Sequence, residues 1–222
     1  MSSSLFACGE NWASQLGPLE DAERREASET WRPSKVSLSF TKKKSIRSGR
    51  HFSVALTLTG NVYMWGVMAG VRLENPSILR FGDPVVCIAA GDKHAIALTR
   101  SGNVYTWGHG SLGRLGHGNM KTVVRPHKVT YFASEVNMSS VVVSVAAGGA
   151  NTSAITSRGD VFIWGWNRYS QLGMGLRGGQ CSATPRQLRH ASLNDVIPAK
   201  IVLSDQHSAL VTKKGQLYTW FV

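Results

Sequence analysis

The sequence predicts an all-β fold made of repeated antiparallel sheets. A short aromatic phrase recurs along the 222 residues, and each full copy follows an apolar run and a glycine turn. Almost no segment shows a sustained helical period. A repeat period of roughly 40–60 residues is typical of propellers and solenoids. Because 42% of the residues are hydrophobic and only 17% are charged, the chain is expected to fold into sheets that stack face to face.

The recurring phrase is a strand with a tryptophan near its end. It reads GNVYMWG at 60–66, GNVYTWG at 102–108, GDVFIWG at 159–165 and GQLYTW at 215–220. A degenerate copy, LFACG, has Cys8 in place of the tryptophan. The equivalent positions are 57, 42, 57 and 56 residues apart, so the second interval is short.

Each copy predicts a β-hairpin. In HAIALTRSGNVYTW (94–107), β-branched and aromatic residues flank a turn that contains Gly102. Glycine allows the positive φ of a tight reversal without steric cost. Alternation along the second strand separates Val104 from Tyr105 onto opposite faces. The recurring tryptophans are expected to pack in the core or between sheets: Trp65, Trp107, Trp164 and Trp220.

Glycine-rich loops follow three of the copies, at 9–17, 108–116 and 165–173. Residues 108–113 satisfy the GxGxxG pattern of dinucleotide sites, but that motif needs a following helix within a βαβ unit. The other two loops lack GxG, and no GKS or GKT suggests a P-loop. We therefore expect inter-strand turns and no bound cofactor.

Histidines recur near the start of the hairpins, at His51, His94 and His207, with Asn151 in another copy. A metal site is disfavoured because there is one histidine per repeat, so a hydrogen bond that locks the hairpin is the preferred interpretation. Seven acids follow residue 30, and no nucleophile, carboxylate pair or catalytic motif stands out. The sequence predicts neither a metal site nor an enzyme.

The segments outside the repeats carry less information. The charged insert 19–30 is expected to be a short helix or an ordered loop, and looser tails occupy 31–36, 124–129 and 184–188. No apolar stretch is long enough to span a bilayer, and no signal peptide is visible. Three dispersed cysteines indicate reduced thiols, so cytoplasmic or nuclear localisation is expected.

These repeats resemble the regulator of chromosome condensation repeat, whose unit reads approximately AGxxHSxALTxxGxVYxWGxNxxGQLGxG. The resemblance implies a β-propeller, typically of seven four-stranded blades. It predicts one partial propeller domain over residues 1–222, an incomplete ring of about four of the seven blades. An open blade face would then invite self-association, unless the chain is a truncated product. The copies lie near 1–17, 48–66, 90–118, 147–175 and 204–222.

The net charge of +12 favours an acidic or polyanionic partner, although a basic protein can also be merely soluble. The expected function is a non-catalytic protein-interaction module, with chromatin as one candidate partner. The resemblance implies an alternative, guanine-nucleotide exchange on a Ran-like small GTPase. A basic run and two loop tryptophans are the candidate partner-binding residues. For the run, a solvated edge strand is the favoured alternative interpretation. These residues are Lys42, Lys43, Lys44, Arg47, Arg50, Trp12 and Trp166.

Overall fold

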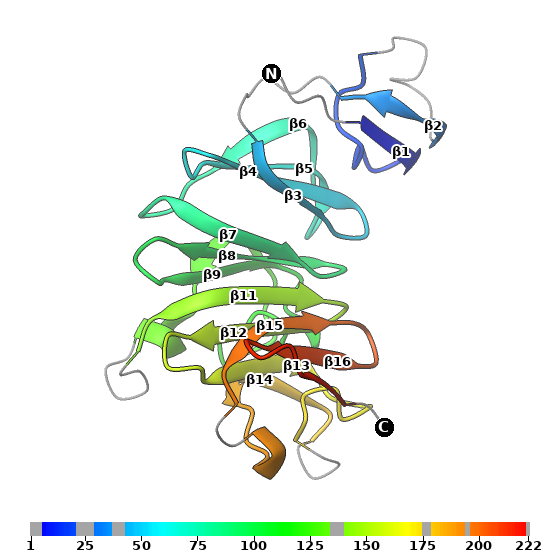
Figure 1. The fold of residues 1–222 in the computed structure, drawn as a ribbon. Helices are drawn as coiled ribbons and strands as arrows, with labels where there is room; N and C mark the ends of the chain where they lie inside the picture. Colours follow the sequence, from blue (N-terminus) through cyan, green and yellow to red (C-terminus); the bar gives the residue numbers. More distant parts are fainter. Residues whose placement is uncertain are drawn as a thin grey trace.

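The computed structural model describes residues 6–20, 29–36, 43–133, 140–174, 179–193 and 196–220. Within these ranges, seventeen strands form five antiparallel sheets that follow one another along the molecule (Figure 1). In each sheet the strands lie side by side in chain order. The predicted all-β architecture of stacked sheets is therefore confirmed.

The first sheet pairs β1 (Phe6–Glu10) with β2 (Glu29–Lys35). The second contains β3 (Lys43–Ser48), β4 (Phe52–Thr57), β5 (Val62–Met68) and β6 (Val71–Leu79). The third contains β7 (Val85–Ala90), β8 (His94–Thr99), β9 (Val104–Gly108) and β10 (Val123–Lys128). The fourth contains β11 (Val142–Gly148), β12 (Asn151–Thr156), β13 (Val161–Trp166) and β14 (Cys181–Gln187).

The fifth sheet has three described strands, β15 (Pro198–Leu203), β16 (Ser208–Thr212) and β17 (Leu217–Trp220). Three short 3-10 helices lie in connections: η1 (Ser111–Gly113), η2 (Thr130–Ala133) and η4 (Ala191–Leu193). Contacts between neighbouring sheets join β3 to β7, β7 to β11 and β11 to β15. In the second to fifth sheets the first strand is therefore the inner strand, and the arrows of β7 and β11 point the same way in Figure 1.

The turn between the second and third strands repeats in four sheets. The hydroxyl of Thr99 accepts a hydrogen bond from the backbone N–H of Asn103 at 3.2 Å, and Gly102 between them has φ +84°. Three further threonine hydroxyls accept the same bond at 3.0–3.1 Å. The threonine holds the reversal while the glycine provides its positive φ. These residues are Thr57, Thr156 and Thr212.

The core lies between the sheets. Ile96 and Leu98 of β8 pack against Val145 and Trp164 of the fourth sheet, and comparable clusters join the second sheet to the third and the fourth to the fifth. Every residue of β4, β8 and β12 is buried, because each of these strands is covered on both faces. The prediction that the repeated tryptophans pack between sheets is confirmed: Trp65, Trp107 and Trp164 are buried and Trp220 is half-buried.

Each glycine-rich loop is fastened to the next sheet by a shared carbonyl oxygen. The carbonyl of Arg114 accepts hydrogen bonds from Trp164 Nε1 at 3.0 Å and from the Thr152 hydroxyl at 2.7 Å. The same arrangement recurs twice along the chain. Gln15 accepts from Trp65 and Ser53, and Gln171 accepts from Trp220 and Ser208. The glycine loops thus connect consecutive strands of one sheet, as predicted, and they also fasten that sheet to the next, which the sequence analysis did not predict.

The second sheet lacks such a loop, which explains its short sequence interval. Its β5 runs directly into β6 through a turn at Ala69 and Gly70. Without a loop carbonyl, Trp107 Nε1 of the third sheet instead contacts Met64 Sδ at 3.4 Å. Ala95 occupies the position at which the other sheets have a serine or threonine hydroxyl. The third sheet therefore lacks both hydrogen bonds to a loop carbonyl, the one from the hydroxyl and the one from the indole.

Two expectations need correction. His51 is not equivalent to His94: the register places Phe52 in that slot, and His51 lies one residue earlier. The ring of His94 does not lock its own hairpin, because its Nε2 lies 2.7 Å from the Thr152 hydroxyl in the next sheet. In the charged insert, residues 21–28 lie outside the described part of the chain.

The tails, which received no structural assignment from the sequence, form the outer strands β2, β10 and β14. In the third and fourth sheets these tails are the fourth strands of their repeats.

Candidate protein-interaction site

The stacked sheets present two faces built from different segments. We call the loop face the side that carries the turns between first and second strands together with the loops that follow third strands. The turn face is the opposite side, with the threonine–glycine turns and the first residues of the inner strands. Gly60 lies beside Pro84, Gly102 beside Val141 and Gly159 beside Pro198, so successive sheets contribute to one continuous turn face.

On the loop face, Trp12 lies at the centre of an aromatic and basic group. Its ring lies against the ring of His51, with centroids 4.5 Å apart, and is 50% exposed. Its indole N–H donates to Glu10 at 3.3 Å, and Arg72 donates to its carbonyl oxygen at 3.1 Å. Arg50 precedes His51 and is exposed. We call Trp12, Arg50, His51 and Arg72 the Trp12 cluster.

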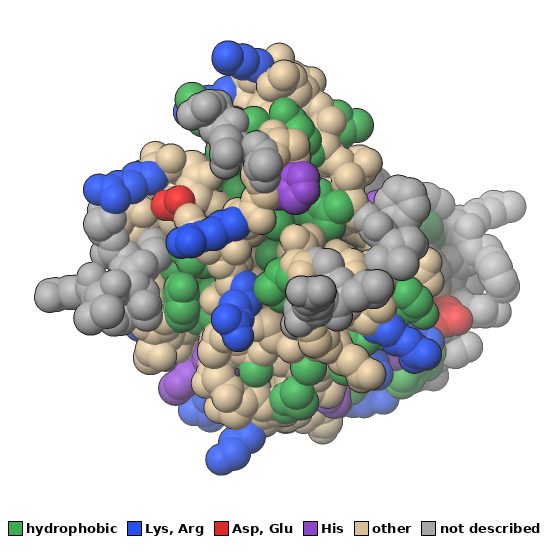
Figure 2. Space-filling model, turned by 90° about the horizontal axis from the view of Figure 1, so that it is seen from below, with side chains coloured by type: hydrophobic (Ala, Val, Ile, Leu, Met, Phe, Trp, Pro, Cys, Tyr) green, Lys and Arg blue, Asp and Glu red, His purple; other side chains and the backbone are tan. Residues whose placement is uncertain are grey.

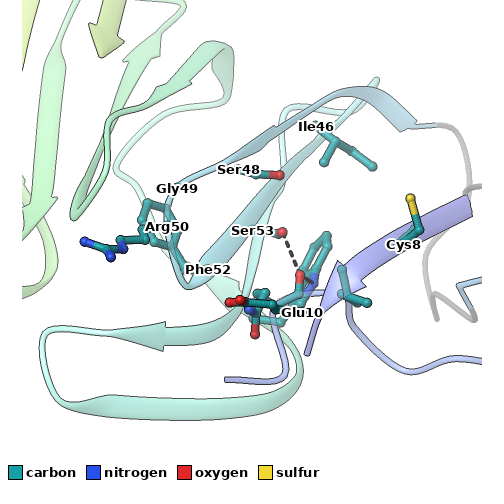
Figure 3. A pocket seen from close by; sticks show the side chains of 12 residues that line it. Cys8, Glu10, Ile46, Ser48, Gly49, Arg50, Phe52 and Ser53 are labelled. Carbon is teal, nitrogen blue, oxygen red and sulfur yellow. Dashed lines mark hydrogen bonds between the residues drawn. The ribbon is translucent and has the colours of Figure 1, made fainter. Parts of the chain in front are cut away.

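Two hollows flank the Trp12 cluster. A pocket of about 180 Å³ lies between the second and third sheets, lined among others by Arg50, His51, Lys93 and His109. A larger cavity of about 520 Å³ separates β1 from β3 and β4 (Figure 3). In that view Cys8 lies on β1, while Ile46 and Ser48 lie on the opposite wall. A rigid aromatic beside concave surface suits protein recognition.

Positive charge gathers around the smaller pocket. Burial lowers the pKa of His109, and the nearby charges of Lys93 and Arg114 lower it further. Arg114 is itself buried, and burial lowers the pKa of its guanidinium while the carboxylates of Asp92 and Asp205 oppose that shift. His109 therefore stays largely neutral at physiological pH, and the arginines and lysines supply the charge.

Of the six sequence-predicted residues that the structure describes, Trp12 and Arg50 belong to the Trp12 cluster, Arg50 as the neighbour of His51. Trp166, expected in a loop, is instead the last residue of β13, half-buried against Tyr169 of the following loop with ring centroids 5.3 Å apart. The basic run is spread along β3 instead of forming one patch: Lys43 and Lys44 begin the strand at the turn face, whereas Arg50 lies at the loop face.

Two members of the run donate to backbone carbonyls, Lys44 across to the third sheet and Arg47 within its own strand. Lys44 Nζ donates to the carbonyl of Val86 at 2.9 Å, and Arg47 donates to the carbonyl of Ile46 at 2.8 Å. Lys42 lies outside the described residues. Among the described strands β3 pairs with β4 alone, so Arg47 lies on an edge strand. His51 and Arg72 of the Trp12 cluster were not predicted as partner-binding residues, because no aromatic or basic run marks either position.

Catalytic or metal-binding arrangements do not emerge from the described ranges. No group of three or more His, Cys, Asp or Glu side chains there could hold a metal ion. The described cysteines are free thiols. Nor does any helix in the described part of the chain have the length and apolar character to cross a membrane.

Comparison with known sequences identifies the repeat. Residues 101–155 and 158–211 match the family described as "Regulator of chromosome condensation (RCC1) repeat", and a second family of the same description matches 85–114 and 142–171. These matches together cover more than half of the chain.

Similar proteins share the repeat over most of the chain. The Ultraviolet-B receptor UVR8 of Arabidopsis thaliana is 29% identical over 99% of this chain and 49% of its own length. The human E3 ubiquitin-protein ligase HERC2 is 34% identical over 82% of this chain, but over 4% of its own length.

Among solved structures, Prp20p from Saccharomyces cerevisiae superposes with a TM-score of 0.81 at 22% identity. That match covers 98% of this chain and 52% of Prp20p. The chain thus spans about half of these relatives or less. Family match, repeat geometry and superposition agree: the chain belongs to the regulator of chromosome condensation repeat family of β-propellers.

Proposed function

We propose that the chain is a non-catalytic protein-binding propeller module and that the Trp12 cluster on the loop face contacts its partner. The observation that carries this proposal is the half-exposed indole of Trp12, which is fixed by His51 and Glu10. Arg72 holds the backbone carbonyl of Trp12, and the exposed Arg50 precedes His51. Tryptophan and arginine are the residues most enriched at binding hot spots. Because the indole is already fixed, binding would cost little side-chain entropy.

The identity of the partner is a separate and more specific proposal. Prp20p, the yeast protein whose structure superposes on this chain, binds Gsp1p and histones. A Ran-like GTPase and chromatin are therefore the first candidates for this chain. The compartment, cytoplasm or nucleus, stays a prediction.

Nucleotide exchange is the alternative function. Every described strand belongs to one of the five sheets, so within the described ranges no additional hairpin projects toward a GTPase. This disfavours exchange relative to simple binding. Release of a fluorescent nucleotide from a Ran-like GTPase is the direct assay: unchanged release would remove exchange while leaving binding open.

The binding experiment titrates Gsp1p and core histones separately against the purified chain. Trp12→Ala and Arg50→Ala are expected to weaken the partner's binding by about tenfold or more, which is the range of hot-spot truncations. The matched controls are Met120→Ala and Arg125→Ala, at exposed side chains outside the Trp12 cluster. Equal affinity of all four variants would overturn the assignment, and no binding of either probe would reject both candidate partners.

Self-association through an open sheet face stays a separate prediction. On the fifth sheet, Val202, Val211 and Leu217 are 52%, 38% and 66% exposed. Sedimentation velocity at increasing protein concentration tests whether this face pairs with another copy. A single monomeric species throughout would contradict it.

A further inference from the structure

A second surface, the turn face, combines recurring positive charge with recurring exposed apolar side chains. Its exposed bases outnumber its described acids, which are Asp83 and Asp160. Both acids are already engaged: Asp83 accepts the N–H of Ser101 at 2.8 Å, and Asp160 accepts the amide of Gln187 at 2.8 Å. The exposed bases are Lys44, Arg80, Arg100, Arg158, Arg189, Lys200, Lys213 and Lys214.

The apolar side chains repeat with the sheets. In three successive sheets, one backbone hydrogen bond joins the turn to the start of the inner strand. The residue that follows the turn threonine donates its N–H to the carbonyl of the residue that precedes the inner strand. Arg100 donates to Pro84 at 2.9 Å, Ser157 to Val141 at 2.8 Å and Lys213 to Ile197 at 2.9 Å. This bond holds an exposed apolar residue beside a turn that carries one or two bases.

The exposure of these apolar residues is large. Val141 is 57% and Ile197 is 56% exposed, Leu58 in the turn of the second sheet is 63% exposed, and Pro84 is exposed. The lower end of the stack, seen from below Figure 1, also carries separate Lys and Arg side chains and few carboxylates (Figure 2). Single exposed apolar residues are ordinary, but a regular series of them between bases is a pattern.

This alternation distinguishes between two kinds of acidic ligand. Nucleic-acid surfaces offer phosphates at close spacing and favour polar, strongly basic contacts. Valine, isoleucine and leucine would gain nothing from a phosphate backbone, and no exposed aromatic residue of the described turn-face segments could stack on a base. A protein segment with both carboxylates and apolar side chains would satisfy both components of the surface.

We propose that the turn face binds an acidic protein segment in which aliphatic side chains alternate with Asp and Glu. The carboxylates pair with Arg100, Lys213 and Lys214, while aliphatic side chains of the segment pack on Val141 and Ile197. This surface lies opposite the Trp12 cluster, so it is a function beyond the proposed one, and either can fail without the other.

The test uses the full chain and a fluorescent peptide of alternating Asp, Glu and Leu at about 150 mM salt, where exposed charges are partly screened. Arg100→Gln/Lys213→Gln is expected to weaken peptide binding about tenfold, and Val141→Ser/Ile197→Ser about fivefold. Each pair has a control of matched chemistry away from the turn face. These controls, Lys121→Gln/Arg125→Gln and Val71→Ser/Val124→Ser, are expected to change affinity less than about twofold.

Two further probes define the ligand class. A peptide with Ser in place of Leu should bind several-fold more weakly, and a short DNA duplex should bind more weakly than the Leu peptide at the same salt. Tighter binding of DNA, combined with unchanged affinity of Val141→Ser/Ile197→Ser, would overturn the proposal in favour of nucleic acid. Absence of peptide binding at micromolar concentration, or equal losses in the control variants, would also overturn it. Melting temperatures identify any variant that has lost its fold.

Discussion

At the scale of single residues, the repeat depends on glycines at or near the ends of the third strands. Gly66, Gly108 and Gly165 have φ of +93°, +114° and +113°. An added Cβ at Gly108 would collide with the carbonyl oxygen of Lys93, and the two equivalents would meet the carbonyls of His51 and Ala150. These glycines therefore serve two purposes, the positive φ and the close approach of two backbones.

Gly108→Ala is expected to lower the free energy of unfolding by about 3 kcal/mol or more, because strain and a backbone clash act together. Gly70→Ala is the control, since Gly70 also has a positive φ, +82°, but nothing lies within 4 Å of an added Cβ. It should cost about 1–2 kcal/mol, the steric cost of φ alone. Urea unfolding measures both, and equal losses would contradict the close-approach argument.

Two histidines, the buried His94 and the half-buried His117, make stability depend on pH. Burial lowers the pKa of His94 to about 3, and burial together with His127 lowers the pKa of His117 to about 4. Below pH 6.5 the unfolded chain therefore binds protons that the folded chain does not, so stability falls as the pH drops toward these folded values. Between pH 7 and pH 5, His94 should contribute a loss of about 2 kcal/mol. The loss from His117 should be about 1 kcal/mol, because solvent screens its partly exposed ring.

The measurement is urea unfolding across that range, with His117→Gln as the variant that removes one titrating group. The slope of the free energy of unfolding against pH should become shallower in the variant. A wild-type curve that is flat from pH 7 to pH 5 would show that neither ring is depressed.

At the scale of elements, the fastening of each loop to the next sheet is the main link in the stack. Trp164→Phe removes the indole N–H that reaches the Arg114 carbonyl at 3.0 Å. Trp107→Phe removes a comparable volume but only a sulfur contact to Met64. We expect Trp164→Phe to cost about 1 kcal/mol more in the free energy of unfolding, the net value of one hydrogen bond. Equal losses of unfolding free energy in the two variants would mean that the tryptophans stabilise the stack through packing alone and that the hydrogen bond adds nothing.

Much of this element structure followed from the sequence, because hairpin, turn and tryptophan each have a strong local pattern. The inner strands β7, β11 and β15 were harder to predict: their apolar runs have no fixed phrase, and they become recognisable only as the partners of the hairpins that follow. The shift of His51 by one residue can be seen in the sequence, because alignment on Gly49 and Gly91 or on the turn threonines places Phe52 opposite His94.

The binding surfaces were the least predictable, for a geometrical reason. Lys44 and Arg50 are neighbours in a charge run, but a strand of six residues carries them to opposite faces. Conversely, Trp12 and Arg72 are sixty positions apart and meet because the first loop folds over the second sheet. Spacing in the sequence reports proximity only within one element.

At the scale of the whole molecule, stability should vary along the stack, because each sheet gains protection from its neighbours. Residues of β12 are buried throughout, whereas in β16 buried positions alternate with more exposed ones and in β17 none is fully buried. The first sheet has two described strands and shares only limited cover with the second.

Amide hydrogen exchange should therefore be slowest in β8 and β12 and faster in β16, β17 and β1, once intrinsic rates are taken into account. The expected difference between β12 and β16 is at least about tenfold, equivalent to roughly 1.4 kcal/mol of local opening free energy. β12 and β16 can be compared directly, because each is the second strand of its sheet and each ends in the turn threonine. Uniform protection from β1 to β17 would mean that the stack opens as one unit and that neighbour contacts do not set local stability.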